Sequence, residues 1–137
     1  MNTLEWSDAL VLGFEPMDLV HREFVALLGQ AQRATDAQLP SAWSEVIDHT
    51  AQRFERENQW MRKTHFTGAT DHMLQHRVVL NLLRDGLAMT RRGELSPVRE
   101  MAQELATWFV KHNQSLDAAL AMHLRGQADS PHRRLPV

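Results

Sequence analysis

Six polar side chains interrupt the apolar faces that this sequence would bury, and all six are of kinds that bind metal ions in proteins. They are four histidines and two acids, His21, Glu57, His72, His76, His112 and Asp117. A polar group that is buried without a partner costs several kcal/mol. These side chains must therefore pair with one another or surround a cation.

The spacing of two of these histidines favours the cation. His72 and His76 are four residues apart, so on a helix both imidazoles project from one face and can share a metal ion. The sequence contains no cysteine, which excludes disulfides, iron–sulfur clusters and thiolate zinc sites. Imidazole and carboxylate ligands suit iron, manganese or zinc, and a carboxylate between two ions can bridge them. The residues alone leave open which metal binds and whether the site holds one ion or two.

Four segments of the chain have apolar residues in steps of three and four, which is the period of an amphipathic helix. Pro16, Pro40-Ser41 and Ser96-Pro97 stand where three of these helices should begin, and Gly93 stands where another should end. No tract of β-branched residues alternates with polar ones, so we expect no strands. The expected segments are an arm at 1–15, helices at roughly 16–36, 40–64, 71–92 and 97–125, and a flexible tail at 127–137.

These elements predict an all-α fold, a four-helix bundle of up-down-up-down topology with an N-terminal arm, in one metal-binding domain at residues 1–126. The formal charge of −2, from 15 basic and 17 acidic residues, argues against a nucleic-acid surface. The start lacks a basic and apolar leader, and no apolar run is long enough for a membrane helix. We therefore expect a cytoplasmic protein with no nucleic-acid or membrane partner.

Several motifs, taken in order, resemble those of the hemerythrins and bacteriohemerythrins, the HHE cation-binding four-helix bundles. The resemblance covers about residues 4 to 125, nearly all of the expected ordered chain. Each motif alone is weak evidence for the family, whereas the whole set in this order is specific to it. The motifs are Trp6 with Leu12-Gly13, Met17-Asp18-Leu19-Val20-His21, His72-x-x-x-His76, and Trp108-Phe109-Val110-Lys111-His112 followed by Asp117.

The resemblance implies a non-haem di-iron site in which three histidines bind one iron, namely His72, His76 and His112. It implies that His21 binds the other iron and that Glu57 and Asp117 bridge the two. In the family, dioxygen binds reversibly at the iron that has fewer histidines, in a pocket shielded by apolar side chains. Trp108 and Phe109 occupy matching positions here.

The resemblance thus implies a protein that binds dioxygen, or senses oxygen or redox state, without catalytic turnover. An oxidase or peroxidase acting at a more open iron is the alternative, favoured by the loss of one ligand. A degenerate bundle used for iron storage or as an interaction module is a third class.

The lost ligand is on the second helix. The family has the motif His-Phe-x-x-Glu there, whereas this sequence reads Arg53-Phe54-Glu55-Arg56-Glu57. A guanidinium stays protonated and offers no lone pair, so Arg53 cannot coordinate iron.

Three hypotheses follow from this substitution, besides an Arg53 that simply faces solvent. In the first, the second iron is held by His21, the two acids and solvent. In the second, only the three-histidine iron is kept, and Arg53 pairs with Glu57 and Asp117. In the third, His49 replaces the missing ligand. The third is least compatible with helix geometry, because His49 and Glu57 are about 12 Å apart along a helix.

Overall fold

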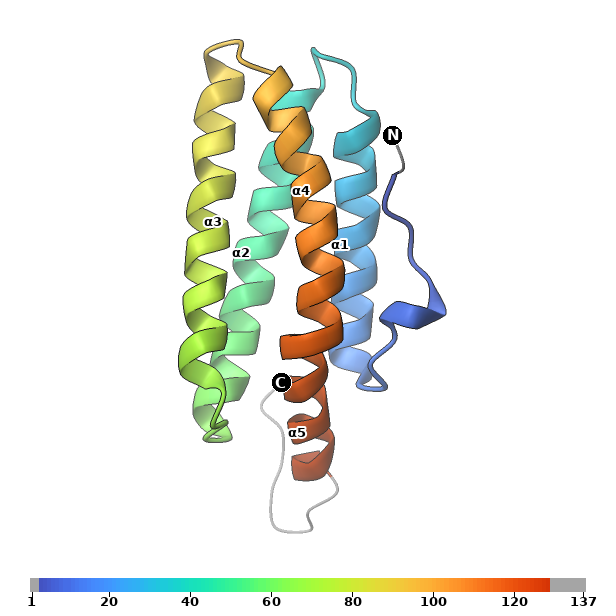
Figure 1. Cartoon of the computed structure of the whole chain (residues 1–137), viewed down its shortest axis with the longest axis vertical. Coiled ribbons are helices and arrows are strands. Elements are labelled where there is room, and N and C mark those ends of the chain that lie inside the picture. Colours follow the sequence, from blue (N-terminus) through green and yellow to red (C-terminus); the bar gives the residue numbers. More distant parts are fainter. Residues whose placement is uncertain (1–2, 129–137) are drawn as a thin grey trace.

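The computed structural model describes residues 3–128, which form a bundle of long antiparallel helices (Figure 1). Its elements are a short 3-10 helix in the arm (Asp8–Leu10), α1 (Glu15–Arg33), α2 (Leu39–Lys63), α3 (Ala69–Arg91), α4 (Ser96–His112), a π-helical turn (Asn113–Asp117) and α5 (Ala118–Ala128). The described residues contain no strand. The predicted all-α four-helix bundle is therefore confirmed.

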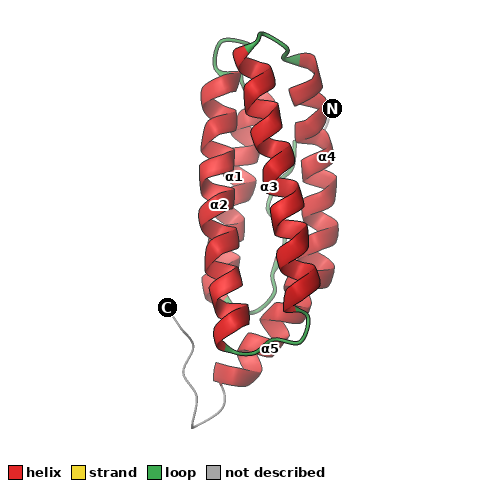
Figure 2. Ribbon diagram, turned by 90° about the vertical axis from the view of Figure 1, so that its left-hand side faces the viewer, coloured by secondary structure: helices red, strands yellow, loops and turns green. Residues whose placement is uncertain are grey.

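The fourth predicted helix, 97–125, is divided into α4 and α5 by the π-helical turn. In Figure 1 α5 continues below α4, whereas Figure 2 shows it slanting beneath α3 toward the end of α2. In both ribbon views α5 extends past the ends of α2 and α3. Of the predicted tail, 127–128 belong to α5, and 129–137 lie outside the described residues.

Prolines and a glycine in the sequence mark several ends of the helices. A proline lies in the first turn of α1, α2 and α4, where its missing N–H leaves no helical hydrogen bond unmade. After α3, Gly93 has a φ of 80°, the left-handed conformation that glycine adopts without a Cβ clash.

Two apolar clusters fill the bundle, one on either side of the polar residues. On α1, His21 lies between Met17 of one cluster and Phe24 of the other. Between α4 and α5, the segment from His112 to Asp117 separates Phe109, in the cluster of Phe24, from Leu120, in the cluster of Met17, in the same way. The polar side chains therefore occupy one layer, closed above and below by hydrophobic packing.

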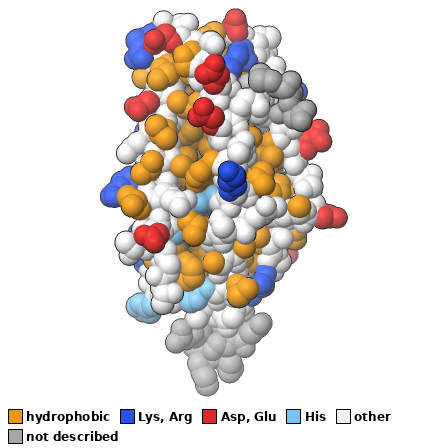
Figure 3. Space-filling model, in the orientation of Figure 1, with side chains coloured by type: hydrophobic (Ala, Val, Ile, Leu, Met, Phe, Trp, Pro, Cys, Tyr) orange, Lys and Arg blue, Asp and Glu red, His pale blue; other side chains and the backbone are white. Residues whose placement is uncertain are grey.

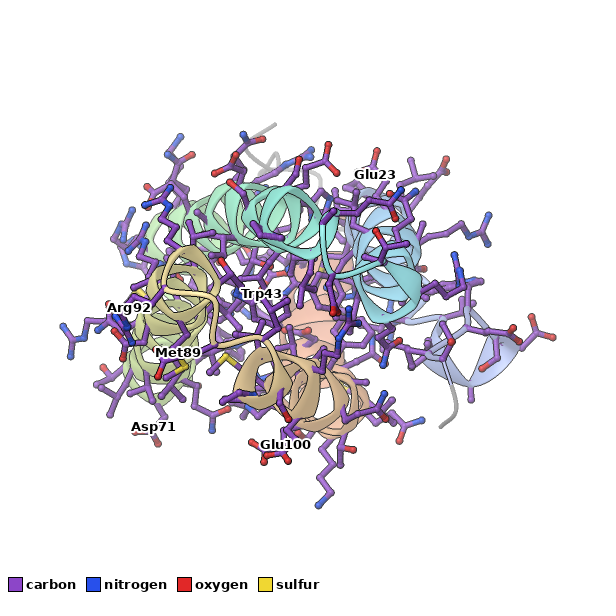
Figure 4. The ribbon with its side chains drawn as sticks, turned by 90° about the horizontal axis from the view of Figure 1, so that it is seen from above. Glu23, Trp43, Asp71, Met89, Arg92 and Glu100 are labelled. Carbon is purple, nitrogen blue, oxygen red and sulfur yellow. The ribbon has the colours of Figure 1, made fainter. Side chains whose placement is uncertain are left out.

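The cluster that contains Phe24 and Phe109 also contains Trp43 of α2. Trp43 points between the helices in Figure 4, whereas Glu23, Asp71 and Glu100 point outward. The Trp43 indole donates a hydrogen bond of 2.9 Å to the carbonyl of Leu83 on α3. A Cβ placed on Gly86 would lie 2.9 Å from Trp43 Nε1 and 2.8 Å from Met101 Sδ. Gly86 therefore has a packing role, because it lets α3 approach the indole closely.

Hydrophobic side chains also reach the surface, between charged ones, on the face shown in Figure 3. Leu74, Val78 and Leu82 follow one another along α3 at 46%, 50% and 52% exposure. No described helix combines the length and the apolar character needed to cross a membrane.

Candidate metal centre

The structure brings the six predicted ligands together in the polar layer. None of them is more than 4% exposed, and they come from α1, α2, α3, α4 and the π-helical turn. One potential ligand atom from each of five residues lies within 4.8 Å of all the others, in the set Glu57, His72, His76, His112 and Asp117. This set contains the three histidines that the resemblance assigns to one iron and the two acids that it assigns as bridges between the irons.

The spacing within this set is that of ligands around one ion. The Nε2 atoms of His72 and His112 are 3.1 Å apart, and Asp117 Oδ1 lies 3.0 Å and 3.1 Å from them. His76 Nε2 lies 3.2 Å from Glu57 Oε1. Two ligand atoms about 2.1 Å from one metal and at right angles to each other would be about 3 Å apart. The cluster therefore has the dimensions of a coordination sphere.

The direction of the lone pairs also fits a metal. Glu57 Oε1 and His76 Nε2 are buried and close together, yet neither has a hydrogen-bond partner. His76 Nδ1 donates to Asn58, so the neutral ring has its lone pair on Nε2, and both atoms of this contact are acceptors. Buried polar groups are normally satisfied, so two orphaned acceptors side by side indicate that a cation belongs between them.

Side chains outside the cluster orient two of the imidazoles. His76 Nδ1 lies 2.9 Å from Asn58 Oδ1, and His112 Nδ1 lies 3.2 Å from Gln75 Oε1. An amide oxygen only accepts, so each Nδ1 donates, and each neutral ring keeps its lone pair on Nε2. This is the arrangement that fixes metal-binding histidines. Sequence reasoning missed both amides, since adjacency to a predicted ligand was their only signal.

The two carboxylates divide their oxygens between two sides of the layer. On one side, Glu57 Oε1 and Asp117 Oδ1 face the three histidines. On the other side, Glu57 Oε2 and Asp117 Oδ2 lie 3.2 Å and 3.4 Å from His21 Nε2. Each acid thus presents one oxygen to each side, which is the geometry of a bridging carboxylate.

His21 differs from the other histidines in its hydrogen bonds. Its Nδ1 lies 3.2 Å from Asn113 Nδ2, and the same amide nitrogen donates to the carbonyl of Leu10 in the arm. Because an amide nitrogen can only donate, His21 Nδ1 accepts, and the neutral ring then has its proton on Nε2. His21 therefore donates to Glu57 in this state and must change tautomer to bind a metal through Nε2. Asn113 is a further residue that sequence reasoning missed.

The π-helical turn explains how His112 and Asp117 reach the same layer. Five residues along a regular α-helix turn the chain by about 140° beyond one full revolution, which would separate the two side chains. The wider π turn at Asn113–Asp117 takes up this difference. The spacing of five residues between His112 and Asp117 therefore reflects the π turn between them.

The protonation states of the cluster suit a cation. Burial and the charge of Asp117 raise the pKa of Glu57, but the imidazoles of His21 and His76 outweigh them and bring it to about 2. Burial also raises the pKa of Asp117, and the imidazoles beside it, His112 foremost, hold that pKa well below its usual value. Burial lowers the pKa of His76. At neutral pH the carboxylates are ionised and His76 is neutral, as metal binding requires.

Arg53 is buried in the same region, at 3% exposure, so the hypothesis that it faces solvent is wrong. Its guanidinium carbon lies 4.4 Å, 4.9 Å and 5.5 Å from the ring centres of Phe24, Phe54 and Phe109. None of its three side-chain nitrogens has a hydrogen-bond partner among the described residues. The structure therefore gives Arg53 no hydrogen-bonded fork with Glu57, as the second hypothesis would require.

His49 lies apart from the cluster. Its Nε2 is 3.3 Å from Glu23, a carboxylate on α1 that is 66% exposed. This contact pairs one ring nitrogen with a surface carboxylate, and His49 is not among the residues whose potential ligand atoms lie together.

The two predicted pocket aromatics lie on different sides of the layer. Phe109 is fully buried, with its ring centre 5.5 Å from that of His21 and 4.8 Å from that of Phe24. Trp108 stacks on His112 with ring centres 4.3 Å apart. Phe109 therefore shields the His21 side, and Trp108 covers the three-histidine side.

Comparisons with known proteins agree with this geometry. The family model described as "Hemerythrin HHE cation binding domain" matches residues 12–124. The chain is 32% identical over 124 residues to a bacteriohemerythrin of Ralstonia nicotianae, a match that covers 90% of each chain. It is 26% identical over 125 residues to a bacteriohemerythrin of Stenotrophomonas maltophilia, covering 88% of this chain and 81% of that relative.

Proposed function

The chain belongs to the hemerythrin family of HHE cation-binding domains, and from this premise we propose that it binds iron in its core and there binds dioxygen or senses oxygen or redox state. The observation that carries the proposal is the buried five-residue cluster, whose potential ligand atoms all lie within 4.8 Å of one another. The proposed activity is binding of a small ligand without catalytic turnover.

The first iron is assigned to the three-histidine side of the layer. His72, His76 and His112 would bind it through Nε2, with Oε1 of Glu57 and Oδ1 of Asp117. Asn58 and Gln75 hold two of these imidazoles in the ligand tautomer, so the site needs little rearrangement on loading. Burial of all five groups keeps competing water away.

The second iron is assigned to the opposite side, with His21 and the outer oxygens of Glu57 and Asp117. The divided carboxylates support this position. It has fewer protein ligands than the first, which leaves coordination positions for a small ligand. When bound, iron supplies the change of oxidation state on which dioxygen binding depends. The chain's own contribution is to bridge the ions with two carboxylates and to enclose the position with Phe24 and Phe109.

A centre with one iron is the second candidate, with oxidase or peroxidase activity, or iron storage, as its function. Two observations favour it. Arg53 stands at the position of the missing histidine, and His21 has its Nε2 proton directed at Glu57. Arg53 places a positive charge, and His21 an N–H donor, where the second iron would need a ligand with a lone pair.

The two candidates differ in iron content and in spectrum. The test is to load the protein with ferrous iron without oxygen, measure iron per chain, and record the absorption spectrum on exposure to air and after its removal. Two irons, with ligand-to-iron charge-transfer absorption that reverses when oxygen is withdrawn, are expected for dioxygen binding. One iron without that absorption would refute the carrier function and favour the one-iron centre.

The matched controls are two histidine variants. His76→Ala removes a ligand and should abolish iron binding at the first position. His123→Ala removes a histidine of α5 that contacts Thr64 outside the cluster, and should leave iron content unchanged. Equal iron content in both variants would contradict the assignment of the site.

A further inference from the structure

The buried guanidinium of Arg53 has N–H donors with no hydrogen-bond acceptor among the described residues. Arg53 is 3% exposed, and Nε and both terminal nitrogens lack a hydrogen-bond partner among the described residues. A guanidinium has five N–H groups and no way to lose its charge at physiological pH. Such a group is normally buried only with an acceptor, because an unpaired buried charge is strongly unfavourable.

The aromatic rings around Arg53 do not supply that acceptor. Phe24, Phe54 and Phe109 lie 4.4 Å to 5.5 Å from the guanidinium carbon, at distances of cation–π contacts. Ring contacts of this kind stabilise the charge, but the N–H bonds lie in the plane of the guanidinium and still need oxygen or nitrogen acceptors. The three rings therefore fix the position of the guanidinium and leave its N–H groups without acceptors.

The charges around Arg53 also call for an anion once metal is bound. Glu57 and Asp117 supply two negative charges to this buried layer, and both interact electrostatically with Arg53. In the one-iron centre, a single divalent ion together with Arg53 supplies three positive charges, so the layer then has one positive charge in excess, and a second ion would enlarge that excess. Water would solvate the guanidinium but would not neutralise this excess, whereas a monovalent anion would do both.

We propose that Arg53 anchors a binding site for a small, planar, monovalent oxyanion, of the class of nitrite or formate, on the aromatic side of the centre. This proposal rests on the proposed function in that the bound metal supplies the excess charge. A planar oxyanion offers two oxygens to the two parallel N–H groups of the fork, which a spherical halide cannot do. The three phenylalanines restrict the site to small ligands. Arg53 then has a recognition role in this chain in place of the missing coordination.

The test uses zinc-loaded protein, because zinc has no redox chemistry with nitrite. Nitrite, formate and chloride are titrated in turn by isothermal calorimetry, with ionic strength held constant by a bulky sulfonate buffer. We expect the two oxyanions to bind with a Kd of about 1 mM and chloride to bind more weakly.

Two variants of Arg53 separate charge from shape. Arg53→Met keeps a long side chain between the rings without the charge, and should weaken oxyanion binding by about tenfold or more. Arg53→Lys keeps the charge without the fork, and should lose the preference for oxyanions over chloride. Arg56→Gln is the matched control: it removes an arginine of the same helix that also lies over an aromatic ring, Trp60, and should leave affinity unchanged.

Equal affinity in wild type and Arg53→Met would overturn the proposal, because the metal alone would then hold the anion. Absence of binding to wild type at about 20 mM anion would overturn it as well. Metal content is measured separately, so failure to take up metal would count against the proposed function alone. The metal-free chain is titrated in parallel and should show no measurable binding, because the charge of Arg53 does not offset those of Glu57 and Asp117. Equally tight binding by the metal-free chain would contradict the charge argument.

Discussion

Lowering the pH should destabilise the metal-free protein through Glu57 in a defined window. The pKa of Glu57 falls from its ordinary value of 4.5 to about 2, because the imidazoles of His21 and His76 outweigh burial and the charge of Asp117. A carboxyl whose pKa is lower in the folded state stabilises the fold above its unfolded pKa and loses that contribution as the pH falls toward its folded pKa. The window is therefore from about pH 4.5 down to about pH 2.

The difference of about 2.5 between the two pKa values corresponds to about 3 kcal/mol of unfolding free energy, at about 1.4 kcal/mol for each unit. Glu57→Gln removes this ionisation and keeps the shape of the side chain. We expect the unfolding free energy of the variant to fall less steeply with pH than that of wild type below about pH 4.5.

The assay is urea unfolding of metal-free protein, followed by tryptophan fluorescence at a series of pH values. Glu55→Gln is the matched control, since Glu55 lies two residues earlier on α2, is 59% exposed, and pairs with Arg62 at the surface. This control should follow the wild-type curve. Parallel loss of stability in wild type and Glu57→Gln below pH 4.5 would refute the reasoning, because Glu57 would then have the same pKa in both states.

Three further substitutions have defined outcomes. Arg53→His supplies a ligand at the second position and should increase the occupancy of that position by iron when iron is limiting; unchanged occupancy would show that residue 53 is not part of the centre. Asn58→Ala removes the acceptor of His76 Nδ1 and should weaken metal binding by about 10- to 100-fold in a chelator competition, whereas unchanged affinity would exclude an orienting role for the amide. Gly86→Ala places a Cβ 2.9 Å from Trp43 Nε1 and should lower the unfolding free energy by about 1–3 kcal/mol in urea; a neutral result would mean that α3 moves away freely.

The fold could be predicted because its signals are local and repeated. Apolar residues at steps of three and four, with prolines in the first turns, indicate helices that short loops must bring back antiparallel. The interruption at Asn113–Asp117 was not predicted, because one extra residue in a turn leaves almost no trace in an apolar pattern. The exact spacing of His112 and Asp117 was the one available sign of it.

The candidate ligands could be predicted because a polar residue on an apolar face stands out. Their environment could not be predicted in the same way. Whether Arg53 pairs with carboxylates or lies among aromatic rings depends on the rotamer it adopts and on side chains from three helices. The tautomer of His21 depends on Asn113, which is 92 residues away in the chain. Such contacts are set by tertiary packing, and no spacing rule in the sequence describes them.

The most direct test of the central claim, that the buried histidine and carboxylate cluster holds iron, is the position of the metal in crystals of the iron-loaded protein. Anomalous diffraction at the iron absorption edge should give a peak about 2.1 Å from Nε2 of His72, His76 and His112, in contact with Glu57 and Asp117. A second peak beside His21 would indicate the di-iron centre, and its absence the one-iron centre. Iron found only outside this cluster, or no peak in a fully loaded sample, would contradict the claim.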